Sequence, residues 1–287
     1  MAAPRQVERA PLLLLAALAV GCGGGMPLLH PAHTLRPGQI SGSVGASGNF
    51  LLGDADDAIE TTDAAGAANS LGPGSGDETA AGVSASVLGA PGIAPHVAGR
   101  VGVAERTEAG LTYSGRSVRI DGRHAFEDKS RAFSAGLGLR TLLYHPQADP
   151  NDAPSSSGAI TGVDTGGVIG FGVDVPLLVG YRSDAELVQI WGGLRGGYEH
   201  VEGQVLFADP SIPAEEAQNA AELQADEISA EALLGLGVGL SPIWVAVEIA
   251  VGYAHVDGEL RPRGLPPSAA QVDGVTVTPA GAIIGRF

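Results

Sequence analysis

The sequence predicts an all-β fold, a transmembrane antiparallel up-and-down β-barrel of about ten strands, with eight or twelve strands as alternatives. Three observations predict it. Apolar residues alternate with small or polar residues along most of the chain, and the alternating segments are joined by connections of alternating length. In addition, 44 of the 287 residues are glycine and only 17% are charged, whereas about a quarter of the residues of a soluble domain are charged.

Residues 1–21 are predicted to be a secretory signal peptide. Two arginines are followed by the apolar stretch 10–20, which is too short to span a bilayer as a helix. Small residues lead to Cys22, whose position resembles the lipobox of bacterial lipoproteins, and this resemblance implies that Cys22 is lipidated. Cleavage after Ala19 is the alternative, because alanine replaces the usual leucine there. Residues 22–38, rich in glycine and proline, are expected to form an N-terminal linker.

Residues 39–287 are expected to form the barrel. In 166–182, every odd position from 169 onward is apolar, and the even positions are mostly small or polar. A strand with this pattern has one apolar face and one polar face. The predicted strands are 39–50, 95–105, 108–115, 117–127, 131–144, 166–182, 186–203, 228–241, 243–258 and 274–287.

A transmembrane helix is the alternative for residues 232–247, which carry no charge. Glycine occupies alternate positions from 235 to 239, and the pair Ser241-Pro242 interrupts the stretch. Glycine and proline destabilise a helix interior, so the pattern favours two strands joined by a tight turn.

Tight turns alternate with long connections along the chain. The long connections are 51–94, 145–165, 204–227 and 259–273. Transmembrane barrels have short turns on the periplasmic side and longer loops outside, and an even number of strands returns both termini to the periplasmic side.

The last strand runs through Val275, Val277, Pro279, Gly281, Ile283 and Gly285 to Phe287. Together with the signal peptide and the alternating segments, it resembles the small bacterial outer-membrane β-barrel proteins, whose C-terminal aromatic residue is read by the barrel assembly machinery. The resemblance implies that Phe287 is an assembly signal, that the location is the outer membrane of a Gram-negative bacterium, and that outer-membrane lipids and this machinery are the partners. It implies no activity.

Aromatic residues are expected to form two girdles at the membrane interfaces. On the apolar face they cluster at both ends of the predicted strands, at Phe126, Phe133, Tyr181 and Phe287 near the turns and at Phe50, Tyr113, Tyr198 and Tyr253 near the loops. A soluble, anchored cup with its apolar face turned inward is the alternative. The polar face is rich in glycine and carries too few polar side chains for an exterior exposed to water, which favours the membrane barrel.

The polar face carries five arginines and five acids, which are expected to pair across the lumen because unpaired charges away from water are costly. This predicted charge network consists of Arg100, Glu108, Arg119, Asp121, Arg123, Arg140, Asp174, Arg195, Glu231 and Glu248. Ten strands leave a lumen that side chains largely fill. A structural or surface role is therefore expected, with a narrow channel for small ions or solutes as the alternative.

The net charge of −16 argues against a nucleic-acid surface, which requires clustered lysine and arginine. Sixteen acids without a single lysine or arginine lie in 51–78, 145–165 and 204–227. These acidic stretches are expected to be solvated, disordered surface loops. Calcium binding is the alternative, but 54–66 lacks the glycine and final glutamate of a helix-loop-helix site. No metal and no cofactor is predicted.

A hydrolase at the outer rim is a further alternative, because His145, His200 and His255 lie at the loop ends of their strands. Their position in the alternation points all three outward, whereas a catalytic base needs a partner in one shared cleft. No catalytic residue and no enzymatic activity is therefore predicted, and the oligomeric state is left open.

Overall fold

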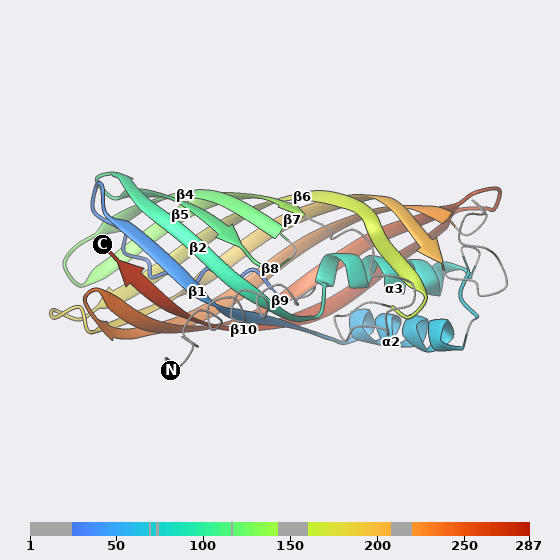
Figure 1. Ribbon diagram of the computed structural model, residues 1–287, viewed down its shortest axis with the longest axis horizontal. Coiled ribbons are helices and arrows are strands. Elements are labelled where there is room, and N and C mark those ends of the chain that lie inside the picture. Colours follow the sequence, from blue (N-terminus) through green and yellow to red (C-terminus); the bar gives the residue numbers. More distant parts are fainter. Residues whose placement is uncertain (1–24, 69, 73–74, 116, 143–159, 208–219) are drawn as a thin grey trace, which may run out of the picture.

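Ten antiparallel strands close into a ring in which each strand pairs with its chain neighbours and the last pairs with the first (Figure 1). The computed structural model describes residues 25–68, 70–72, 75–115, 117–142, 160–207 and 220–287. The strands are β1 (Ile40–Leu52), β2 (Gly92–Ala104), β3 (Thr107–Tyr113), β4 (Ser117–Glu127), β5 (Arg131–Leu142), β6 (Val163–Arg182), β7 (Val188–Phe207), β8 (Ala220–Leu240), β9 (Ile243–Pro262) and β10 (Ser268–Arg286). The predicted fold class and number of strands are confirmed. The predicted signal peptide, Cys22 and His145 lie outside the described residues.

At their loop ends, strands β6 to β10 continue three to eight residues beyond the predicted strands, and they have 19 to 21 residues each, although about 9–11 residues suffice to cross a bilayer. The prediction of long loops at 204–227 and 259–273 was therefore wrong in part. Strand β8 already begins at Ala220, and only residues 263–267 join β9 to β10. The predicted strands ended where the outward positions stop being apolar, although the strands themselves continue with polar residues on the outside.

The side on which β9 carries its apolar residues changes along the strand. From Ile243 to Tyr253 every second side chain is apolar and exposed on the outside of the ring. Beyond Tyr253 the outward positions are polar or charged, and the buried inward positions include Val256 and Leu260. Ten residue steps of about 3.4 Å, tilted by about 40°, rise roughly 26 Å, the height of the apolar band of a transmembrane barrel.

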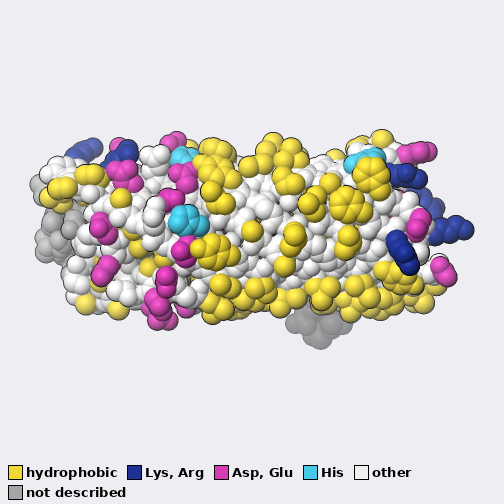
Figure 2. Space-filling view, turned by 180° about the vertical axis from the view of Figure 1, so that it is seen from behind, with side chains coloured by type: hydrophobic (Ala, Val, Ile, Leu, Met, Phe, Trp, Pro, Cys, Tyr) yellow, Lys and Arg dark blue, Asp and Glu magenta, His cyan; other side chains and the backbone are white. Residues whose placement is uncertain are grey.

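We call the part of the barrel with the apolar exterior the membrane section. It extends from the tight turns up to Phe171, Tyr198, Ile228, Tyr253 and Val275, and the part beyond these residues is the outer section. Figure 2 shows the band of hydrophobic side chains, bordered by histidine and acidic side chains where the outer section begins. The exposed apolar exterior decides against the soluble cup.

Two helices, α2 (Asp54–Ala67) and α3 (Asp77–Gly89), connect β1 to β2 in the outer section. The expectation of a long loop over 51–94, with a disordered acidic stretch over 51–78, was wrong. The alanine-rich helix α3 is buried on nearly all sides and packs against β8, β9 and β10. Its fully buried Val83 belongs to a hydrophobic core that includes Val201 and Leu260. The acids of these helices lie mainly in their first turns, where they interact favourably with the helix dipole.

Strands β1 to β5 are shorter than β6 to β10 and do not extend as far into the outer section. The outer section is therefore a sheet of the long strands β6 to β10, whose inner face is covered by the helices. Within the described part of the chain, neither helix is both long enough and apolar enough to cross a membrane.

Candidate functional site

The lumen of the membrane section is occupied by the chain's own N-terminal residues. Residues 26–35 are all buried, and we call residues 25–35 the lumen segment. The segment begins at the level of Ser47 in β1, whose Oγ donates a 2.8 Å hydrogen bond to the carbonyl of Gly25. It ends at the tight turns, where Thr34 contacts Glu127. The expectation of an N-terminal linker over 22–38 was therefore wrong for residues 25–35, and among the described residues 25–38 only 36–38 are exposed.

A buried glutamate of β9 holds the middle of the lumen segment. The two carboxylate oxygens of Glu248 accept hydrogen bonds from the amides of Leu28 and Leu29 at 2.8 and 3.0 Å. The indole nitrogen of Trp191 donates a third hydrogen bond of 2.9 Å to the same carboxylate. The predicted role of Glu248 as a partner for an arginine was wrong, because in this structure its hydrogen bonds come from main-chain amides and an indole.

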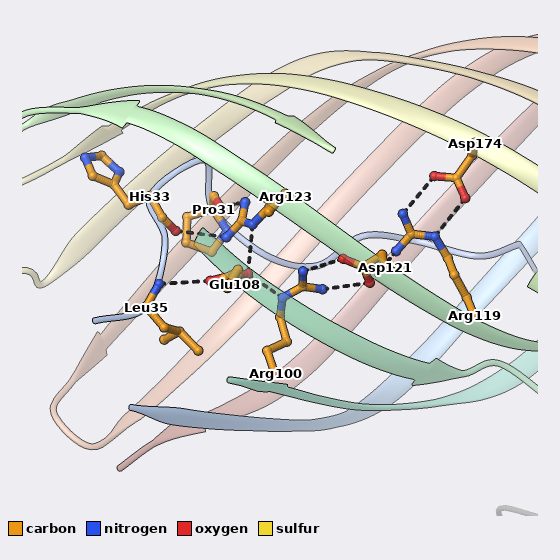
Figure 3. Close-up of polar contacts among 9 residues, drawn as sticks. All are labelled: Pro31, His33, Leu35, Arg100, Glu108, Arg119, Asp121, Arg123 and Asp174. Atoms are coloured by element: carbon orange, nitrogen blue, oxygen red, sulfur yellow. Dashed lines mark hydrogen bonds and ion pairs between the residues drawn. The ribbon is translucent and has the colours of Figure 1, made fainter. Parts of the chain in front are cut away.

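Arg123 and Glu108 hold the other half of the lumen segment (Figure 3). The guanidinium of Arg123 donates to the carbonyls of Pro31 and His33 and, through Nε, to Glu108 at 2.8 Å. Glu108 in turn accepts a 2.9 Å hydrogen bond from the amide of Leu35. One ion pair of the barrel wall therefore binds both a donor and acceptors of the segment's main chain.

Two further charged residues hold the ends of the segment. Glu127 accepts hydrogen bonds from the amide and the hydroxyl of Thr34 at 3.0 and 3.2 Å. Arg195 donates to the carbonyl of Met26 and forms a 2.5 Å ion pair with Glu231. Glu127 and Trp191 were not among the predicted lumen residues, since neither belongs to the set of paired charges on which that prediction rested.

The structure places all ten residues of the predicted charge network inside the barrel and joins six of them in one chain of ion pairs (Figure 3). In order, these six are Arg123, Glu108, Arg100, Asp121, Arg119 and Asp174. Arg119 binds Asp174 through two parallel hydrogen bonds of 2.8 Å, a bidentate geometry that favours arginine. The side chains of Arg119 and Glu108 are only 2% and 1% exposed, so their charges are stabilised by their ion-pair partners and not by water.

Arg140 pairs with Glu199, an acid that the predicted network did not include. Glu199 lies on the same face of its strand as Arg195, four residues earlier, so the alternation itself was the signal that could have found it. Both Arg140 and Glu199 line a cavity of about 50 Å³ between the lumen segment and α3. A cavity of this size holds a few water molecules.

Apolar contacts seal the lumen segment against the wall. Leu28, Leu29 and Ala32 belong to a buried cluster with Trp191, Trp244 and Ile284. The membrane section is therefore filled by ion pairs, by the segment and by this cluster.

Two outward clusters, each with a histidine hydrogen-bonded to an aspartate, lie where the outer section begins. Tyr198 and His200 both bond Asp226 Oδ1, at 2.5 and 2.8 Å, and His255 bonds Asp273 Oδ1 at 2.6 Å. The hydrogen bond to Asp273 raises the pKa of His255, which lies beyond the membrane section, above its usual value. Both histidines face outward, as their place in the alternation predicted.

A closed antiparallel ring with an apolar belt outside and paired charges inside is the architecture of a transmembrane β-barrel, and such barrels reside in bacterial outer membranes. The chain is an outer-membrane β-barrel protein by this architecture.

No family model matches the chain, and no curated protein matches its sequence. Among solved structures it is similar to Ail, the attachment invasion locus protein of Yersinia pestis, with 8% identity, 88% of this chain and 100% of that chain covered, and a TM-score of 0.34. It is also similar to the outer membrane protease OmpT of Escherichia coli, with 7% identity, coverages of 88% and 99%, and a TM-score of 0.41. For a major outer membrane protein of Thermus thermophilus the values are 12%, 86%, 99% and 0.35. At such identities and TM-scores, the similarity carries no argument about activity.

Proposed function

We propose that this protein has a structural or surface role in the outer membrane, as a barrel that is closed to solutes in its resting state. The observation that carries the proposal is the lumen segment, whose buried main chain is bonded to charged groups of the wall. Charges that could line an aqueous path are instead used to hold one another and this segment. The outer section adds a second closure through α3.

A narrow channel for small ions or solutes is the second candidate. The cavity above the lumen segment favours it, because Arg140, Arg195 and Glu199 line a space that could conduct if the segment withdrew. A rim hydrolase gains no support from His200 and His255, since each faces outward and is bonded to an aspartate on the neighbouring strand.

Assembly through Phe287 and contact with outer-membrane lipids complete the proposal, and lipidation of Cys22 is proposed for molecules whose lumen segment is not seated in the barrel. The lumen segment places a geometric condition on lipidation. Two residues separate Cys22 from Gly25, and the three residue steps between them span at most about 11 Å. Ser47, which holds Gly25, lies seven residues above the start of β1, about 18 Å along the barrel axis. A lipid on Cys22 therefore reaches the membrane only in molecules whose lumen segment has left the barrel.

Planar-bilayer recording of the detergent-refolded protein tests the closed barrel. We expect no discrete conductance steps at protein loadings that give steps with a porin in the same bilayer. Heat-modifiable gel migration of the same sample shows that the barrel is folded. Regular steps from the folded protein would overturn the proposal in favour of the channel.

A further inference from the structure

We propose that the lumen of the membrane section is a binding site for an extended peptide, recognised through its main chain, and that residues 25–35 occupy this site as a ligand in cis. The inference goes beyond a closed barrel, because it assigns a chemical class of ligand to the lumen.

Side chains of the barrel wall bind the main chain of the peptide in the lumen. Eight main-chain groups of the lumen segment bond to wall side chains. The amides that donate belong to Leu28, Leu29, Thr34 and Leu35, and the carbonyls that accept belong to Gly25, Met26, Pro31 and His33. Among the polar side chains of the segment, His33 makes no ring hydrogen bond within the described part of the protein, whereas Leu28, Leu29 and Ala32 pack in the apolar cluster of the wall. Recognition of this kind tolerates variation at the polar side chains, as it does when a peptide adds to a sheet edge.

The two arginines of the wall that bind the segment are held in place independently of it. Arg123 is anchored by Glu108, which also pairs with Arg100, and Arg195 is anchored by Glu231. The donors and acceptors are therefore aimed into the lumen before a peptide arrives, and such preorganisation lowers the entropic cost of binding.

The wall also requires an occupant. Glu248 is 4% exposed, and two of its three hydrogen-bond donors are amides of the lumen segment. Without a peptide, this carboxylate keeps the indole of Trp191 and loses the other two donors. A buried carboxylate with so few donors is costly, so the site is built for a ligand that supplies consecutive amides.

At its C-terminal end the lumen segment continues through residues 36–39 into β1. Residues 36–38 are exposed, and the amide of Gly38, whose φ is 80°, donates a 2.8 Å hydrogen bond to the carbonyl of Gly102. When the segment leaves the lumen, the chain therefore turns at this exposed connection. Leu29 has a φ of 49°, which is unfavourable for a residue with a side chain and makes the segment sensitive to substitution there.

Binding of a peptide in trans to the full chain tests the proposal. Leu29→Pro removes one donor to Glu248 and fixes φ near −65°, so it weakens the cis ligand and leaves the wall intact. The probe is a fluorescently labelled synthetic peptide of residues 25–36, followed by anisotropy. We expect saturable one-to-one binding to the Leu29→Pro protein and at least about tenfold weaker binding to the wild type, whose own segment competes at millimolar effective concentration.

Two altered peptides identify what is recognised. A peptide N-methylated at Leu28 and Leu29 lacks both donors to Glu248, and we expect its binding to weaken at least about tenfold. A peptide with alanine at Met26, His30 and His33 keeps the main chain, and we expect its affinity to stay within about tenfold. Equal binding of the N-methylated peptide, or no binding to a folded Leu29→Pro barrel, overturns the proposal.

Hydrogen exchange in the full chain provides a test that does not depend on the refolding of Leu29→Pro. Glu248→Gln should speed exchange at the amides of Leu28 and Leu29, whereas the control Glu259→Gln in the outer section should leave it unchanged. Unchanged exchange in Glu248→Gln would contradict the assigned role of the carboxylate. Silent conductance together with no peptide binding would refute this inference while leaving the closed barrel in place.

Discussion

Arginine placed on the apolar belt should destabilise the protein only within the membrane section. Ile249 is 47% exposed on the outside of β9, near the middle of the belt that runs from Ile243 to Tyr253. Arginine at the bilayer midplane on the lipid face of a barrel costs about 2–4 kcal/mol. Ile249→Arg should therefore shift the folding equilibrium by a factor of roughly 30 to 1,000, since about 1.4 kcal/mol corresponds to tenfold.

Gln271→Arg is the matched control. Gln271 also faces outward, on the adjacent strand β10, but it lies in the outer section beside Asp257. We expect a change within about 0.5 kcal/mol there, as for most surface substitutions. Urea unfolding of both variants in lipid vesicles, followed by heat-modifiable migration, measures the difference. Equal stability of the two variants would refute the assignment of the apolar face to lipid.

Three other predictions concern the interior, the outer section and the N-terminus. Arg119→Ala leaves the buried Asp121 and Asp174 short of donors and should cost about 3–5 kcal/mol in urea unfolding, whereas Arg261→Ala, an exposed pair with Glu259, should cost at most about 1 kcal/mol; similar losses would contradict a buried network. Leu88→Ala in α3 should cost about 2–5 kcal/mol and speed hydrogen exchange in the outer section, while the half-exposed Leu265→Ala should do neither; an unaffected outer section would argue against α3 as its core. Intact-mass measurement separates molecules acylated at Cys22 from unacylated ones. Limited proteolysis should cut within residues 25–35 of the acylated molecules, and these residues should be protected in the unacylated ones. Protection in acylated molecules would refute the position of Gly25 in the lumen.

The alternation of side chains was sufficient to predict ten strands because the period of a strand is two whatever lies on either side of it. It located the strand cores of β1 to β10 and the inward charges from Arg100 to Glu248. It did not predict which charges pair within the network. Arg140 could pair with any acid at the same height in the barrel, and only the register across β5, β6 and β7 places it beside Glu199.

The lumen segment left no comparable signal in the sequence. Its polar contacts are made mainly by main-chain amides and carbonyls, which every residue carries, so no side-chain pattern reports them. The acidic stretch 51–78, within the predicted connection 51–94, was misleading for a related reason. Its charges indicated a solvated loop, while the alanine-rich face of α3 finds a core only because five strands continue past the membrane.

The sequence by itself determined the barrel, the apolar face of each strand and the presence of paired charges inside, since these follow from the period of two and from the cost of exposing charge to lipid. Only the tertiary structure decided what fills the barrel. Below, the chain's own N-terminal residues satisfy Glu248, Arg123 and Glu127, and above, α3 covers the inward apolar faces of the long strands. The physical reason is that the residues of a strand determine only that its inward face must be covered. Which element covers that face depends on which distant segment the closed ring brings close to it.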